Sequence, residues 1–202
     1  MNKTSRWTIA GVMLAASVVS ASAQQGVRLR GTIDKVDGNV LTLKPTAGAT
    51  LMLTLLANAR IVVVVKASLA DIKPGTFLGS AAMPQPDGSQ KALELHIFPE
   101  EMRGTGEGHR PYAPVANSTM TNGTAVGATV AAMDGQIMTV TYKGGEKKIM
   151  VPAGVPIVRY EIGKPGDLKP GAHFTVLSAV KKPDGSFETN RINVGRDGTV
   201  PQ

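Results

Sequence analysis

The residues best suited to chemistry lie near the middle of the chain. Glu94 and His96 alternate along an expected β-strand, so their side chains share one face. The segment that follows adds Glu100, Glu101, Glu107 and His109. Imidazole and carboxylate suit divalent zinc, copper or nickel, and Met102 would add a soft donor for copper(I). Because the spacing matches no known ligand signature, two interpretations stay open: a divalent-metal site, or a solvated strand and connector.

The chain has no arrangement typical of an enzyme. Its three histidines, His96, His109 and His173, lie outside any Gly-x-Ser-x-Gly motif. The adjacent carboxylates of Glu100 and Glu101 do not define the opposed pair that a glycosidase needs. The absence of cysteine excludes a thiol enzyme, a disulfide scaffold and a thiolate metal site. We therefore predict neither an enzymatic activity nor a cofactor.

The charge is mildly basic and dispersed. Without residues 1–23 the chain keeps 20 basic and 15 acidic residues, a net charge of +5. Adjacent basic residues occur only at Lys147-Lys148 and Lys181-Lys182. Such a pattern fits a soluble surface with a positive bias, and a polyanion-binding face is the alternative. Because the aromatic residues are scattered, they do not predict the stacking platforms of a nucleic-acid-binding protein.

The elements that must position these residues come from a sequence that repeats itself. Four landmarks recur in the same order, 96 or 97 positions apart. They are Asp37-Gly38 with Asp134-Gly135, Val40–Leu43 with Ile137–Val140, Asp71–Gly75 with Asp167–Gly171, and Pro86–Ser89 with Pro183–Ser186. The repetition predicts two similar units.

Each unit is expected to be a small β-barrel. The strands expected in the first unit are 28–36, 40–43, 50–55, 61–65, 76–82 and 91–98, with one helical turn at 68–75. Those of the second are 128–133, 137–142, 146–151, 155–160, 173–180 and 187–194. Short strands with turn signals at this spacing predict an all-β fold of two tandem antiparallel five- to six-stranded barrels, similar to oligonucleotide/oligosaccharide-binding (OB) barrels.

Alternation along the strands predicts which side chains form the core. In the last strand of the first unit, Leu93, Leu95 and Ile97 are expected to point inward. In the last strand of the second unit, Ile192 and Val194 are expected inward, and Arg191 and Asn193 outward. The run Ile61–Val65 is apolar on both faces, which predicts a strand between the two barrels or, alternatively, a partner-binding edge.

The boundaries follow from composition. Lys3 and Arg6 precede an uncharged apolar stretch and Ala21-Ser22-Ala23, the pattern of a cleaved signal peptide over residues 1–23. The first barrel is then expected over 24–99, a long irregular linker over 100–125, the second barrel over 126–196, and a tail over 197–202. We expect a periplasmic or secreted protein that does not span a membrane after cleavage.

The chain resembles a family of uncharacterised bacterial exported proteins with tandem OB-like barrels. The resemblance rests on a glycine-containing first strand, the Asp-Gly hairpin, the Leu-x-x-Gly turn, the strand after Pro-Asp-Gly, and the linker Phe98–Pro111. Some relatives carry the label metal-transporter permease. No second membrane-spanning segment is predicted here, so the resemblance implies contact with a metal but not a permease. The sequence thus predicts a non-catalytic exported binding or structural module with an unknown protein or small ligand as partner. The alternative is a periplasmic metal-binding accessory protein that uses the linker.

Overall fold

The computed structural model describes residues 26–131 and 135–201. This part of the chain is all-β, as predicted, and contains no α-helix. The strands in chain order are β1 (Val27–Asp37), β2 (Val40–Pro45), β3 (Leu51–Lys66), β4 (Phe77–Pro84), β5 (Gln90–Ile97), β6 (Gly108–Pro111), β7 (Thr119–Ala131), β8 (Gly135–Tyr142), β9 (Gly145–Val151), β10 (Ile157–Ile162), β11 (His173–Lys181) and β12 (Phe187–Gly195). Short 3₁₀ turns are η1 (Leu69–Asp71), η2 (Glu100–Met102) and η3 (Pro165–Asp167).

Two predictions concern residues outside the described ranges: the signal peptide over 1–23, and Asp134 of the second Asp-Gly hairpin. The first hairpin is confirmed. Gly38, between β1 and β2, has φ of +60°, the left-handed conformation that a tight hairpin turn requires. No helix among the described residues has the length and apolar character needed to cross a bilayer.

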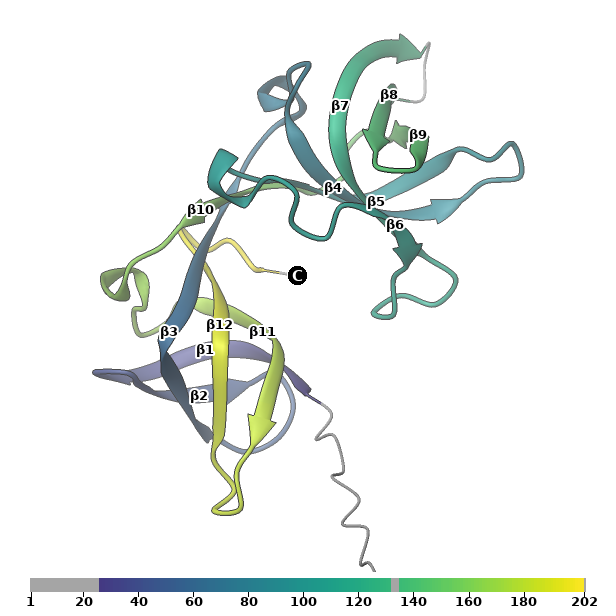
Figure 1. The fold of residues 1–202 in the computed structure, drawn as a ribbon. Coiled ribbons are helices and arrows are strands. Elements are labelled where there is room, and N and C mark those ends of the chain that lie inside the picture. The colour runs from purple at the N-terminus through teal and green to yellow at the C-terminus, as the bar shows by residue number, and fades with distance from the viewer. Residues whose placement is uncertain (1–25, 132–134, 202) are drawn as a thin grey trace, which may run out of the picture.

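Five strands close into a barrel, which we call the first barrel. Antiparallel pairs join β11 to β1, β1 to β2, β2 to β3 and β11 to β12. A parallel pair between β12 and β3 closes the ring, so the barrel is not purely antiparallel. Its interior is apolar and holds side chains such as Leu41, Leu53, Phe174 and Ile192. Figure 1 shows this barrel in the lower half of the view.

The other strands form a second circuit. Antiparallel pairs join β5 to β4, β4 to β7, β7 to β8 and β8 to β9. A short parallel pairing of β5 with β9 connects the two ends. Leu78, Leu95, Val140 and Ile149 belong to its apolar core. Leu95 and Ile192, predicted as inward residues of the two units, are both fully buried.

Each set of strands draws on both repeats. The first barrel combines β1–β3 with β11 and β12, and the second circuit combines β7–β9 with β4 and β5. These sets do not follow the predicted boundaries 24–99 and 126–196. The physical reason is β3, a continuous strand of 16 residues that leaves the first barrel instead of turning back.

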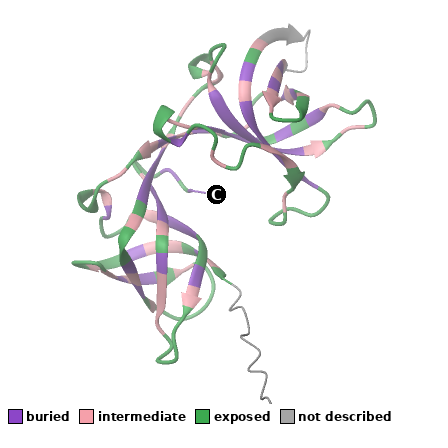
Figure 2. Cartoon of the chain, viewed as in Figure 1, coloured by how far each residue is buried: buried purple, intermediate pink, exposed green. Residues whose placement is uncertain are grey.

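The crossing of β3 and β10 is locally symmetric. Val64 pairs with Tyr160, and each lies seven residues before the aspartate of its own repeat, Asp71 or Asp167. Side chains on both faces of β3 are buried here: Ile61 and Val63 pack in the first barrel, and Val62 and Val64 pack with Tyr160. Residues Ile61–Val64 of the run Ile61–Val65 are therefore buried on both faces of β3, whose buried residues are purple in Figure 2. The position of the run between two tandem barrels stays a prediction.

Two expectations need correction. The segment 100–125 is not uniformly irregular, because it contains η2, β6 and the start of β7, whose Thr119–Asn122 stretch pairs with both β4 and β6. Leu93 does not point into the core but is 38% exposed. A register shift between Ala81 and Ala82 interrupts the β4–β5 ladder, so Ala92 takes the inward position.

Candidate functional site

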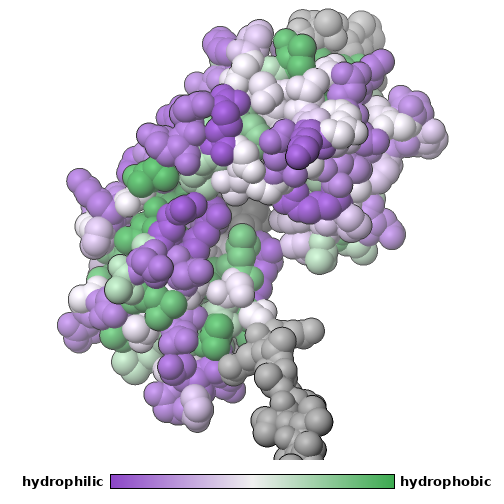
Figure 3. Space-filling view, in the orientation of Figure 1, coloured by the Kyte–Doolittle hydropathy of each residue, from purple (hydrophilic) through white to green (hydrophobic). Residues whose placement is uncertain are grey.

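A cleft of about 660 Å³ opens between the first barrel and the second circuit. Arg28 of β1, Leu177 of β11 and Arg191 of β12 line it from the first barrel. Residues of β5, β6, β7 and the loop after β6 line the opposite wall, and Tyr160 of β10 lies between. Figure 3 shows the surface hollowed between the two lobes, on the side to which the loop after β6 projects in Figure 1. The volume lies within the range of small-molecule sites, about 300–1,000 Å³.

Strand alternation places Arg191 at the cleft. Ile192 and Val194 are buried in the first barrel, so Arg191 and Asn193 face the other way, as predicted. Arg191 Nε donates a hydrogen bond to Asn193 Oδ1 at 3.2 Å, and Asn193 is itself buried. Burial lowers the pKa of Arg191. The side chain nevertheless stays charged at neutral pH, because an ordinary arginine pKa is about 12.5 or higher.

Arg28 reaches the cleft for the same reason. Its neighbour Leu29 packs into the first-barrel core, which turns Arg28 outward. The Nε atom of Arg28 is buried and has no hydrogen-bond partner in the described part of the chain. A buried donor without a partner is uncommon and costs stability, so this guanidinium is not optimised for the fold alone.

Arg110 is held by the loop that precedes it. Its Nη1 donates a hydrogen bond to the Gly106 carbonyl at 2.6 Å. Asn122 of β7 fixes the same loop, since its Nδ2 donates to the Thr105 carbonyl at 2.9 Å. Gly106 has φ of +55°, and a Cβ there would lie 3.0 Å from Arg110 Nη2. Glycine therefore leaves the space in which the guanidinium lies.

Three rings pack together beside these arginines. His96 stacks on Tyr160 with centroids 5.3 Å apart, and the Phe98 ring lies edge-on to Tyr160 at 5.2 Å. Burial raises the pKa of Tyr160 well above its ordinary value, and the Glu94 carboxylate raises it further, while Arg191 acts in the opposite direction. The Tyr160 hydroxyl consequently stays protonated at neutral pH.

The cleft carries positive charge without counter-ions. Of the residues that the structure describes, no aspartate or glutamate lines it. Within the described residues, Arg28, Arg110 and Arg191 form no ion pair. Guanidinium groups donate hydrogen bonds in a planar fork that matches carboxylate and phosphate groups. The arrangement can therefore bind an anion.

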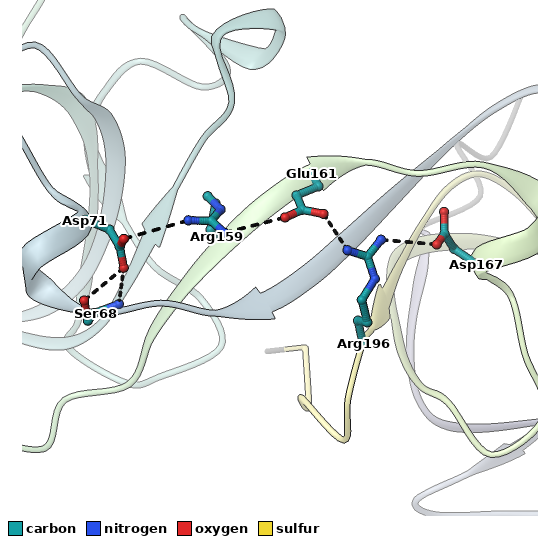
Figure 4. Close-up of polar contacts among 6 residues, drawn as sticks. All are labelled: Ser68, Asp71, Arg159, Glu161, Asp167 and Arg196. Carbon is teal, nitrogen blue, oxygen red and sulfur yellow. Dashed lines mark hydrogen bonds and ion pairs between the residues drawn. The ribbon is translucent and has the colours of Figure 1, made fainter.

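The opposite face of β10 shows a different use of arginine. Arg159 lies 3.9 Å from Asp71 Oδ1 and 3.7 Å from Glu161 Oε1. Arg196 continues the chain of charges, 2.7 Å from Glu161 Oε2 and 3.2 Å from Asp167 Oδ1. Figure 4 shows the resulting line of alternating charges. It connects the turn after β3 to the turn after β10, so it braces the crossing between the two halves.

The two aspartates at the ends of this line also cap their turns. Asp71 Oδ2 accepts hydrogen bonds from the Ser68 backbone N–H and hydroxyl at 2.7 and 2.9 Å. Asp167 Oδ2 accepts one from the Lys164 backbone N–H at 2.9 Å. These bonds lower the pKa of both carboxyl groups, and the Arg196 guanidinium lowers that of Asp167 further.

The structure separates the six predicted metal ligands. Glu94 Oε1 and His96 Nε2 lie 2.9 Å apart and are buried, within ion-pair distance but without hydrogen-bond alignment. His109 is directed to β7 and Tyr142, where its Nδ1 lies 2.8 Å from Thr121 Oγ1. Burial lowers the pKa of His109, and Lys147 contributes.

The other three predicted ligands lie in the loop. Glu100 accepts hydrogen bonds from Arg103 at 2.5 and 2.8 Å, Glu107 accepts one from the Lys143 backbone N–H at 2.9 Å, and Glu101 is exposed. In residues 26–131 and 135–201, no three histidine, aspartate or glutamate side chains come close enough to hold a metal ion.

Sequence reasoning missed the cleft arginines because no run of basic residues marks them. Arg28, Arg110 and Arg191 come from the first strand, a loop-bordering strand and the last strand. Only the outward orientation of Arg191 was predicted. Arg28 and Arg191 lie on strands of the first barrel, and Arg110 lies on β6 in the opposite wall of the cleft.

Comparison of the chain with protein-family models, with curated proteins and with solved structures finds no match.

Proposed function

We propose that the protein is an exported, non-catalytic binding protein that holds an anionic ligand in the cleft. The observation that carries this proposal is the set of three cleft arginines, Arg28, Arg110 and Arg191, without ion-pair partners in the described residues. Like charges repel one another, so three guanidinium groups around one cleft destabilise the fold unless an anion binds there and offsets the repulsion. An anion supplies the missing acceptors.

The other groups of the cleft support binding rather than catalysis. A tyrosine hydroxyl is protonated at neutral pH, and the raised pKa of Tyr160 makes its ionisation harder still, so it is unsuited to act as a general base. The imidazole of His96 is buried between the Tyr160 ring and the Glu94 carboxylate. The packed rings and the hydrogen bonds that hold Arg110 and Arg191 restrict these side chains before a ligand binds, which lowers the entropy lost on binding.

We also propose that the fold is a tandem repeat of one OB-like unit, whose last two strands are exchanged between the copies. The repeated landmarks and the symmetric pairing of Val64 with Tyr160 support this.

The basic, apolar and small-residue pattern of residues 1–23 supports export with cleavage after Ala23, which places the protein in the periplasm or outside the cell.

Calorimetric titration with citrate at fixed, low ionic strength tests the binding proposal. The mature protein should bind citrate saturably at one site, and Arg191→Gln should weaken binding by about tenfold or more, because a charge-assisted pair is lost. Lys91→Gln is the matched control, since it removes an exposed positive charge of β5 that does not line the cleft. Absence of saturable binding, or equal affinities for wild type and Arg191→Gln, would overturn the proposal.

A further inference from the structure

The cleft continues into a second hollow of about 320 Å³. Arg28, Tyr112 and Pro114 line both hollows, and Arg30 lines only the second. Leu29 is buried in the first barrel, so Arg28 and Arg30 project from the same face of β1. Two residues along a strand correspond to about 7 Å. The two hollows therefore adjoin one another at Arg28, Tyr112 and Pro114, and we call the pair of them the path.

Positive charge follows this path from end to end. Arg110 and Arg191 lie in the first hollow, Arg28 at the junction and Arg30 in the second hollow. Arg30 is exposed and has no ion pair within the described part of the chain. Glu94 also lines the second hollow, but its residue is only 8% exposed and its carboxylate lies 2.9 Å from His96. The cations that a ligand in the second hollow would meet are thus Arg30 and, at the boundary with the first hollow, Arg28.

The remaining surface of the path indicates which kind of polyanion fits. His96 stacks on Tyr160 and Phe98 lies edge-on to the same ring, so these three rings form one cluster rather than a row of separate faces for successive nucleobases. Tyr112, which lines both hollows, is a single further ring. In the second hollow, Leu93 and Val115 are exposed apolar side chains suited to the C–H face of a sugar ring. Asn122 lines the first hollow, and its Oδ1 is a buried acceptor without a hydrogen-bond partner among the described residues, so it matches a ligand hydroxyl group.

From these observations we propose that the ligand is an acidic oligosaccharide, a chain of carboxylate-bearing sugar units that runs from the cleft across Arg28 into the second hollow. One carboxylate lies among Arg28, Arg110 and Arg191, and Arg30 binds the carboxylate of a later unit. This inference rests on the proposed function, because it requires that the cleft binds an anion.

Titration with galacturonate oligomers, from the monomer to the hexamer at fixed ionic strength, tests the inference. Affinity should rise about tenfold or more between the monomer and the tetramer, because the second carboxylate binds as part of an already bound chain. Arg30→Gln should abolish this gain and leave citrate affinity within about twofold, since Arg30 lies outside the first hollow. Lys91→Gln should retain both the gain in affinity with oligomer length and the affinity for citrate. Methyl-esterified oligomers should not bind, because they carry no carboxylate.

Each other outcome has a defined meaning. If citrate binds but galacturonate affinity does not depend on length, the path does not bind a chain, and the inference fails while the proposed function stands. If neither citrate nor galacturonate binds, the proposed function itself fails. Binding of oligoglutamate, polyphosphate or oligothymidylate as tight as that of the galacturonate hexamer would overturn the assignment to sugars.

Discussion

Arg159 and Arg196 lie beside one face of β10, whereas Arg28, Arg110 and Arg191 surround Tyr160 on the other. Arg159 and Arg196 each lie within ion-pair distance of two carboxylates. Arg28, Arg110 and Arg191 form no ion pair with another described residue. The same residue type therefore serves two purposes. Paired guanidinium groups connect the halves of the fold, and unpaired ones retain the capacity to bind an acceptor that the chain does not supply.

The largest loss in the free energy of unfolding is expected from substitutions in the apolar cores. The effects expected at both sets of arginines are smaller. Leu95→Ala and Ile192→Ala should each lower the free energy of unfolding by about 2–5 kcal/mol, because each removes a fully buried side chain. Urea unfolding measures the loss. The two positions are equivalent in the repeats but lie in different cores, so a near-zero loss at either one would show that its strand is placed incorrectly.

A smaller effect is expected where the backbone positions an unpaired arginine. Gly106→Ala should weaken citrate binding several-fold, because its Cβ would lie 3.0 Å from Arg110 Nη2. Gly104→Ala is the control: its φ of +81° imposes a similar backbone strain, but its Cβ would meet no atom within 4 Å. Calorimetric titration of both variants should show a loss for Gly106→Ala alone. Equal losses would mean that loop strain, rather than Arg110, determines affinity.

The smallest effect is expected in the paired set. Asp167→Asn should lower the free energy of unfolding by less than about 1 kcal/mol at pH 7, because the ion pair is partly exposed. The pKa of Asp167 is lowered in the folded protein, so its carboxylate stabilises the fold above the ordinary aspartate pKa of about 3.9. The difference from wild type should therefore shrink as the pH falls below about 5 and vanish once the folded carboxyl is protonated.

Chemical unfolding of wild type and Asp167→Asn between pH 7 and pH 2 measures this dependence. Asp197→Asn serves as control, since Asp197 forms no ion pair with another described residue. A difference between wild type and Asp167→Asn that stays constant down to pH 2 would show that the loss does not come from the carboxylate charge.

Local patterns predicted the strands and much of the core. The alternation of apolar residues and the preference of β-branched residues for strands can both be recognised within a few neighbouring positions of the sequence. Leu95 and Ile192 lie where alternation places them, and Ile61–Val64, apolar on both faces in the sequence, are buried on both. Leu93 does not, since a register shift in the β4–β5 ladder alters the alternation, and no residue pattern marks that shift.

The assignment of β4–β5 and β11–β12 to their strand sets, and the cleft between those sets, depend on information that the sequence does not carry locally. The two repeats have the same turn landmarks, so β4–β5 and β11–β12 fit either partner by pattern alone. Glu94 and His96 share a face and lie close, as predicted, yet Glu100, Glu107 and His109 are directed elsewhere by their own hydrogen bonds, and Glu101 is exposed. Arg28 and Arg191 meet only because the first and last strands join one barrel.

The measurement that tests the contrast most directly is thermal melting of Arg191→Gln and Arg196→Gln, each with and without saturating citrate. We predict that Arg196→Gln melts below wild type without citrate and keeps the full citrate-induced rise in melting temperature. Arg191→Gln should melt at the wild-type temperature without citrate and lose most of that rise, because a ligand stabilises only the folded state that binds it. If Arg191→Gln instead melts lower without citrate and retains the rise, Arg191 serves the fold as Arg196 does, and the account of the cleft is wrong.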